Sequence, residues 1–140
     1  MRRPVELTGM DTARRVVLLE CGMGVLWIGL GVLNVGLADL RAAWWIALAA
    51  AASTVAVAYT DEHDLFGWSD WRRYAAAVAG VVAAAVAVGL VVLATDLVVL
   101  TIVSAALAGM GTGLLAYRFV YGVVRPVPES RLDAAGDRAV

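Results

Sequence analysis

Residues 13–38 read ARRVVLLECGMGVLWIGLGVLNVGLA, a long apolar run that also carries a polar and glycine pattern. On a helix, at about 100° per residue, five of its residues fall within about 80° of one another and form one stripe: Glu20, Gly24, Trp27, Gly31 and Asn34. Gly22, Gly29 and Gly36 form a second stripe on roughly the opposite side. Glycines let neighbouring backbones approach closely in lipid, so we expect this helix to have partners on both sides.

The composition of the whole chain agrees with a membrane protein. Its 140 residues are 62% hydrophobic, and the mean hydropathy is +0.83. So few polar residues cannot cover a soluble globule of this size. At 1.5 Å per residue, four apolar runs are long enough to cross a hydrocarbon core of about 30 Å. We predict an all-α integral membrane protein with four transmembrane helices, at about 16–37, 42–59, 74–94 and 97–120.

The connections between these runs set the expected organisation. Residues 38–41 and 95–96 are very short links, so the four helices should form two tandem antiparallel hairpins. We expect an N-terminal arm over 1–12, one bundle over 13–122 with a loop at 60–73, and a flexible tail over 123–140. The first span is too long for a signal-peptide core and lacks a small-residue cleavage site after it, so it should be uncleaved.

Arginine positions predict the orientation. The chain has eleven basic residues, and with both termini inside, Arg41 is the single one placed on the outer side. Short cytoplasmic segments are enriched in arginine and lysine. We therefore expect a multi-pass protein of the cell membrane whose termini and 60–73 loop are cytoplasmic.

Some sequence pairs recur along the chain. Three dipeptides return at an offset of 57 or 58 residues: Arg14-Arg15 with Arg72-Arg73, Asp39-Leu40 with Asp96-Leu97, and Ala58-Tyr59 with Ala116-Tyr117. The recurrence fits a parallel repeat about an axis along the membrane normal. It also fits any four-helix protein with arginines and turn residues at matching membrane boundaries, so both interpretations stay open.

Small residues predict the packing faces of the last two helices. Ala105, Gly109 and Gly113 repeat a small-xxx-small spacing in the fourth run. The third run has a small face, which we expect to pack inward while the valines meet lipid: Ala76, Gly80, Ala83, Ala84 and Ala87.

Glu20 is the strongest candidate for chemistry. It lies roughly 7 Å inside the cytoplasmic boundary if the helix enters the membrane at Arg15. Ionisable groups within spans often mark transport sites, so Glu20 could bind a proton or cation. Alternatively it reaches the headgroups, or pairs with Arg72 or Arg73 at the same level. Arg118 should be a poorer partner, because it points about 140° away from the small face of its helix.

The other polar residues favour structural roles. We expect Asn34 to join helices by a hydrogen bond, or to bond to a backbone carbonyl near the first turn, rather than to bind a substrate. We expect Trp27 to fill space between glycine and alanine neighbours. Residues 61–64 read Asp-Glu-His-Asp, but four consecutive side chains do not easily converge on one ion, so a solvated acidic loop is the simpler interpretation.

The chain lacks recognisable catalytic signatures. It has no nucleophile elbow, phosphate-binding glycine loop or metal-ligand spacing. It contains only one cysteine and one histidine. No basic patch with interleaved aromatics indicates nucleic acid. We therefore expect no enzyme activity, no catalytic residue, no metal and no cofactor.

A carboxylate near the start of the first of four short helices is similar to the small multidrug resistance transporters, and Glu20 stands at the matching position. The resemblance covers one residue and the helix count. The arginine asymmetry and the longer acidic and aromatic loop depart from that family, so we carry no activity over.

The sequence therefore leaves two functional hypotheses. The first is a non-enzymatic helix-packing protein in the lipid bilayer, either a homo-oligomer or a subunit bound to another membrane protein. The alternative is a minimal transporter or channel for a small ion or solute, with a path lined by polar residues of two helices: Glu20, Asn34, Thr101, Ser104 and Thr112.

Overall fold

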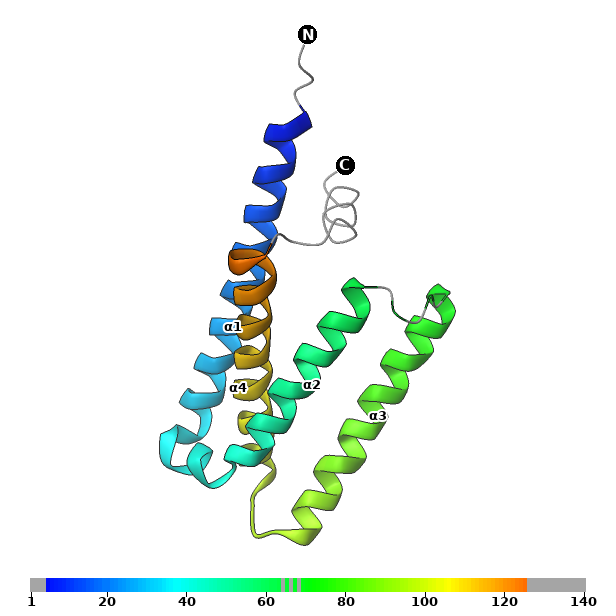
Figure 1. The fold of residues 1–140 in the computed structure, drawn as a ribbon. Coiled ribbons are helices and arrows are strands. Elements are labelled where there is room, and N and C mark those ends of the chain that lie inside the picture. The colour runs from blue at the N-terminus through cyan, green and yellow to red at the C-terminus, as the bar shows by residue number, and fades with distance from the viewer. Residues whose placement is uncertain (1–4, 64, 66, 68, 126–140) are drawn as a thin grey trace.

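The computed structural model describes residues 5–63, 65, 67 and 69–125, and these form helices and connections without a strand. The elements are α1 (Val5–Ala42), α2 (Trp44–Glu62), α3 (Asp70–Ala94), α4 (Val99–Arg118) and the π-helical turn η1 (Phe119–Val124), shown in Figure 1. Within these described residues, three segments are long and apolar enough to cross a membrane: Arg14–Ala42, Trp71–Ala94 and Val99–Val124. The predicted fold class, an all-α membrane protein with four helices, is confirmed.

The chain reverses direction sharply after α1. Gly36 has φ 79° and ψ 169°, in a region that glycine reaches without a steric penalty, so α1 kinks there before continuing to Ala42. Ala43 alone separates α1 from α2 and is fully buried. Residues 95–98 join α3 to α4. Short links therefore connect the helices within each pair, as predicted.

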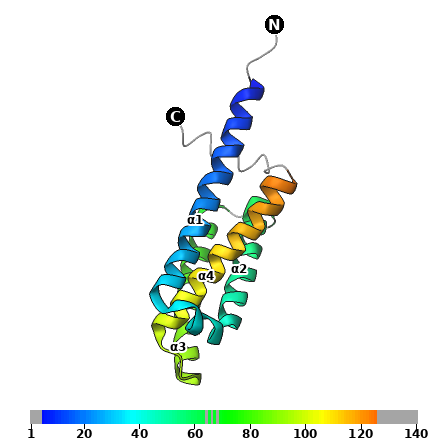
Figure 2. The ribbon, with the colours of Figure 1, turned by 90° about the vertical axis from the view of Figure 1, so that its left-hand side faces the viewer.

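The central helix is the last one. α4 packs against both α1 and α2, whereas α1 and α2 hardly touch each other. Figure 1 shows the helices in the order α1, α4, α2, α3, and Figure 2, turned by 90°, has α1 and α4 nearer the viewer than α2. The antiparallel hairpins are thus interleaved: the main contacts join one hairpin to the other.

The first face of α4 receives α1. A β-carbon at Gly31 would lie 2.5 Å from the carbonyl oxygen of Ser104 and 3.0 Å from the β-carbon of Ala108. A β-carbon at Gly24 would lie 3.0 Å from the carbonyl oxygen of Gly111. These approaches exclude larger side chains, so Gly24 and Gly31 face α4 of their own chain.

The second face of α4 receives α2. A β-carbon at Gly113 would lie 2.5 Å from the carbonyl oxygen of Ala51, and one at Gly109 would collide with the carbonyl of Ala47. Ala105 is fully buried. The predicted small-xxx-small spacing is therefore a packing face, and α4 can lie in the middle because it is narrow on two sides.

Helix α3 stands apart from this three-helix core. No residue in its most apolar window is buried, and it makes few contacts with α4. Gly80 belongs to the small face expected to pack inward, yet a β-carbon added there would meet no neighbouring atom of the described chain within 4 Å. The expectation of inward packing is wrong within this chain, because the core consists of the contacts of α4 with α1 and α2, and α3 lies outside it.

Candidate functional site

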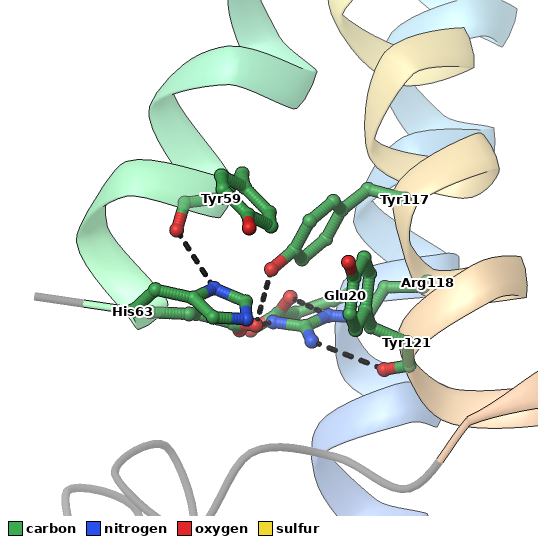
Figure 3. Close-up of polar contacts among 7 residues, drawn as sticks. Glu20, Tyr59, His63, Tyr117, Arg118 and Tyr121 are labelled. Atoms are coloured by element: carbon green, nitrogen blue, oxygen red, sulfur yellow. Dashed lines mark hydrogen bonds and ion pairs between the residues drawn. The ribbon is translucent and has the colours of Figure 1, made fainter. Parts of the chain in front are cut away.

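Three charged side chains from three helices meet at the end of the core remote from the α1–α2 turn (Figure 3). They are Glu20 of α1, Glu62 of α2 and Arg118 of α4, with exposed fractions of 8%, 8% and 2%. Burying a charge is costly unless it is paired and hydrogen-bonded. We call these three residues the charge cluster.

One arginine joins the three helices of the core. Arg118 donates from Nε to Glu20 Oε2 and from Nη2 to Glu62 Oε1. Its Nη1 donates to the carbonyl oxygen of Tyr121 at 3.5 Å. The guanidinium is a rigid, planar group with donors on several edges, so it can hold two carboxylates on different sides. The charge cluster therefore fixes the axial position of α1 and α2 relative to α4.

Tyr117 extends this network. Its hydroxyl donates to Glu62 Oε2 at 2.7 Å, and the ring lies 5.2 Å from the Arg118 Cζ. The ring also stacks on Tyr121, with centroids 4.9 Å apart. Glu62 thus accepts hydrogen bonds from two successive residues of α4, which ties the end of α2 to the end of α4.

A second aromatic pair lies beside the cluster. The His63 ring stacks on Tyr59 with centroids 4.2 Å apart, and Tyr121 meets the His63 ring edge-on at 5.6 Å. His63 Nδ1 lies 2.9 Å from the carbonyl oxygen of Tyr59. Figure 3 shows these rings gathered beside the charge cluster.

The structure corrects the expected partner of Glu20. The prediction that Arg118 is a poor partner is wrong, because α4 has two packing faces rather than one. Arg118 follows Gly111 by seven residues, about two turns, and so lies on the side that receives α1. Of the two arginines predicted as partners of Glu20, Arg73 has its Nη1 atom 4.0 Å from Asp61 Oδ1, and Arg72 is exposed.

Glu62 was missed by the sequence interpretation. The solvated-loop prediction for residues 61–64 is wrong at Glu62, which belongs to α2 and is buried; Asp64 lies outside the described residues. The helical spacing of α2 could have identified Glu62 as a core residue. Glu62 follows Ala51 by eleven residues, which is about 20° from the same direction on a helix, so it continues the face that packs on α4.

The predicted stripe on α1 divides into two parts. Glu20, Gly24 and Gly31 are buried against α4, and Trp27 is half-buried. Asn34 is exposed, and its side chain makes no hydrogen bond to the part of the chain that the structure describes. Contrary to the prediction from the sequence, Asn34 therefore does not join helices within the described part of its own chain.

The chemistry of the charge cluster is that of a helix-joining ion network. Among the described residues, no three histidine, cysteine, aspartate or glutamate side chains are placed to hold a metal ion. No protein-family model, curated protein or solved structure matches this chain. The functional interpretation therefore depends on the geometry of the core and on the surfaces that the core leaves uncovered.

Proposed function

We propose that this protein is a non-enzymatic helix-packing membrane protein, which associates with a second copy or with another membrane protein. The observation that carries the proposal is a contrast. The charge cluster joins α1, α4 and α2 into a closed core, whereas none of the most apolar window of α3 is buried.

The uncovered surfaces have the composition of helix interfaces. In lipid, helices associate through van der Waals contact and interhelical hydrogen bonds, and small residues allow the close approach that this needs. A β-carbon added at Gly80 in the small face of α3, or at Gly22 or Gly29 in the second glycine stripe of α1, would have no neighbour within 4 Å in the described chain. Both surfaces support association beyond the single chain.

The transporter hypothesis receives less support. Of its polar path, Thr101 and Ser104 are buried, but Asn34 and Thr112 are exposed on the outside of the core. Between Ser104 and Arg118 the backbones of α1 and α2 approach α4 at Gly111 and Gly113, where even a β-carbon would be crowded. Such close packing favours a structural core over a solvated path.

We also place this end of the core on the cytoplasmic side of the cell membrane. Arg14 and Arg15 precede the buried part of α1, Arg72 and Arg73 begin α3, and Arg41 stands at the opposite end. The asymmetry follows the positive-inside rule.

A parallel repeat is part of the same proposal. The spatial order α1, α4, α2, α3 puts the two second helices of the hairpins in the middle and the two first helices outside (Figure 1). Thr54 and Thr112, which stand 58 residues apart, both donate to the carbonyl oxygen four residues earlier, at Ala50 and Ala108. The order of the helices is the one expected of two related hairpins, but their packing differs, because α1 packs closely on α4 whereas α3 makes little contact with α2.

The size of the assembly tests the proposed function. We would reconstitute the protein in lipid nanodiscs, measure its mass, and capture tagged protein from native membranes. The expected result is more than one copy, or a stoichiometric membrane partner. Gly80→Leu with Ala87→Leu should weaken an association made through α3, and Val81→Leu, at an exposed site of the same helix, is the matched control.

A monomer without a partner would reject the proposal. Liposome flux of protons or small cations that is lost in Glu20→Gln would favour the transporter instead.

A further inference from the structure

Four residues of α1 that precede the kink at Gly36 recur at alternating spacings of four and three: Met23, Trp27, Leu30 and Asn34. This is the heptad spacing of a two-helix coiled coil, in which such residues form one seam. Met23 and Leu30 are 44% and 43% exposed, Trp27 is half-buried, and Asn34 is exposed. We call these four residues the α1 seam. The core leaves most of it uncovered beside the face that packs on α4.

Asn34 stands in an apolar section of the helix. Its neighbour Leu33 is 83% exposed, and Leu30 one turn earlier is 43% exposed. Gly31 lies against Ser104 and Ala108, so Asn34 lies roughly 6 Å inside the level of Val99, the first residue of α4. An amide at this depth is costly unless a partner accepts and donates its hydrogen bonds.

We propose that the partner of the α1 seam is the α1 seam of a second copy. An asparagine side chain both donates and accepts, so two Asn34 amides related by a two-fold axis can bond to each other reciprocally. Copies inserted in the same orientation bring their α1 helices together in parallel. In a parallel pair Asn34 and Trp27 occupy the same class of heptad position and each meets its own counterpart.

The chemistry of the seam favours a second copy over an unrelated partner. A single polar residue in an apolar heptad seam fixes register and the number of helices in the pair, because a shifted register leaves the amide without a partner. The seam is self-complementary, as a two-fold interface requires. The inference rests on the proposed packing function and names its partner.

Disulfide trapping tests the geometry. Cys21 is the only cysteine, so Cys21→Ala provides a clean background. In that background Leu30→Cys, in the seam, should form a covalent dimer in membranes on mild oxidation. Val25→Cys is the matched control, because Val25 is 61% exposed but lies on the side of the helix that faces away from the seam. Equal trapping at both positions, or none at Leu30→Cys, would overturn the inference.

Substitution of the amide tests its energetic role. Asn34→Leu suits an exposed apolar site and should preserve the core, but should raise the dimer dissociation constant in lipid about tenfold. Asn34→Gln, which keeps an amide, should recover part of the loss, and Leu33→Ala should leave the constant unchanged. Subunit counting by single-molecule photobleaching in vesicles over a range of protein-to-lipid ratios gives this constant.

The possible failures separate the two proposals. An oligomer that is unaffected by Asn34→Leu would overturn the seam and leave the packing function standing. A wild-type monomer without any partner would overturn both.

Discussion

The apolar segments of helices α1 and α3 begin alike but lie in different surroundings. Each segment has an arginine pair near its start, and each is long and apolar enough to cross a membrane. Five residues after the second arginine, however, α1 carries Glu20 and α3 carries Val78. Glu20 is bonded to Arg118 in the core, whereas Val78 is half-exposed on a helix that stands apart.

Hydropathy does not explain this difference. The most apolar window of α3 has a mean hydropathy of 2.7 and none of it is buried, whereas that of α4 has 1.9 and is 39% buried. Lipid is as apolar as a leucine side chain, so hydrophobicity brings a helix into the membrane without bringing it to a neighbour. Among the described residues, a buried charged residue distinguishes α1, α2 and α4 from α3, which has a small face of its own.

The largest expected effect comes from removing the cation that holds α1. Arg118→Met leaves Glu20 and Glu62 buried without this arginine, and should lower the free energy of unfolding by about 3–5 kcal/mol. Reversible unfolding in mixed micelles measures this change. Arg125→Met, at an exposed arginine, is the control and should have an effect below about 0.5 kcal/mol.

A compensating variant sharpens the same comparison. Glu20→Gln and Glu62→Gln combined with Arg118→Met remove both charges that the single substitution leaves, and should recover most of the lost stability. If the single substitution costs less than about 1 kcal/mol, ion pairing is not what separates α1 from α3.

A glycine pair compares the core with α3 at the level of packing. Gly113→Ala puts a β-carbon 2.5 Å from the carbonyl oxygen of Ala51, and should cost about 1–3 kcal/mol of unfolding free energy through displacement of α2. Gly80→Ala meets open space and should change that free energy by at most about 0.5 kcal/mol. Equal effects in the same unfolding assay would show that the two glycines do not differ in packing.

The smallest expected effect concerns one hydroxyl. Tyr117→Phe removes the hydrogen bond to Glu62 but keeps the ring, and should cost about 1–2 kcal/mol because the acceptor is a carboxylate. Tyr121→Phe keeps the stacked ring and is the matched control. A loss for Tyr117→Phe no greater than that of the control would mean that the hydroxyl contributes little to joining α2 and α4.

The sequence predicted the helices well because their signals are local. Runs of apolar residues and short connections decide helix number and direction, and the spacing of Ala105, Gly109 and Gly113 correctly indicated a packing face on α4. The pairing of helices is not local. Nothing in the runs themselves states that α4 lies between α1 and α2, so the small face of α3 was wrongly expected to pack inward.

The charge cluster was predicted only in part, for the same reason. Glu20 stood out because it is a carboxylate inside an apolar run. Arg118 and Glu62 lie at the ends of their helices, where charged residues are common. Only the two-sided packing of α4 brings Glu20 and Glu62 to Arg118. Knowing that α4 has a second face, around Gly111, would have identified Arg118 as the partner.

The middle position of α4 also has a consequence for biosynthesis. A ribosome makes α1 and α2 first, yet these two helices hardly touch, and their carboxylates face the place that α4 will occupy. The core contacts of α1 and α2 therefore form only after α4 has been made and lies between them with Arg118. Until then these two helices lack the surface that joins them.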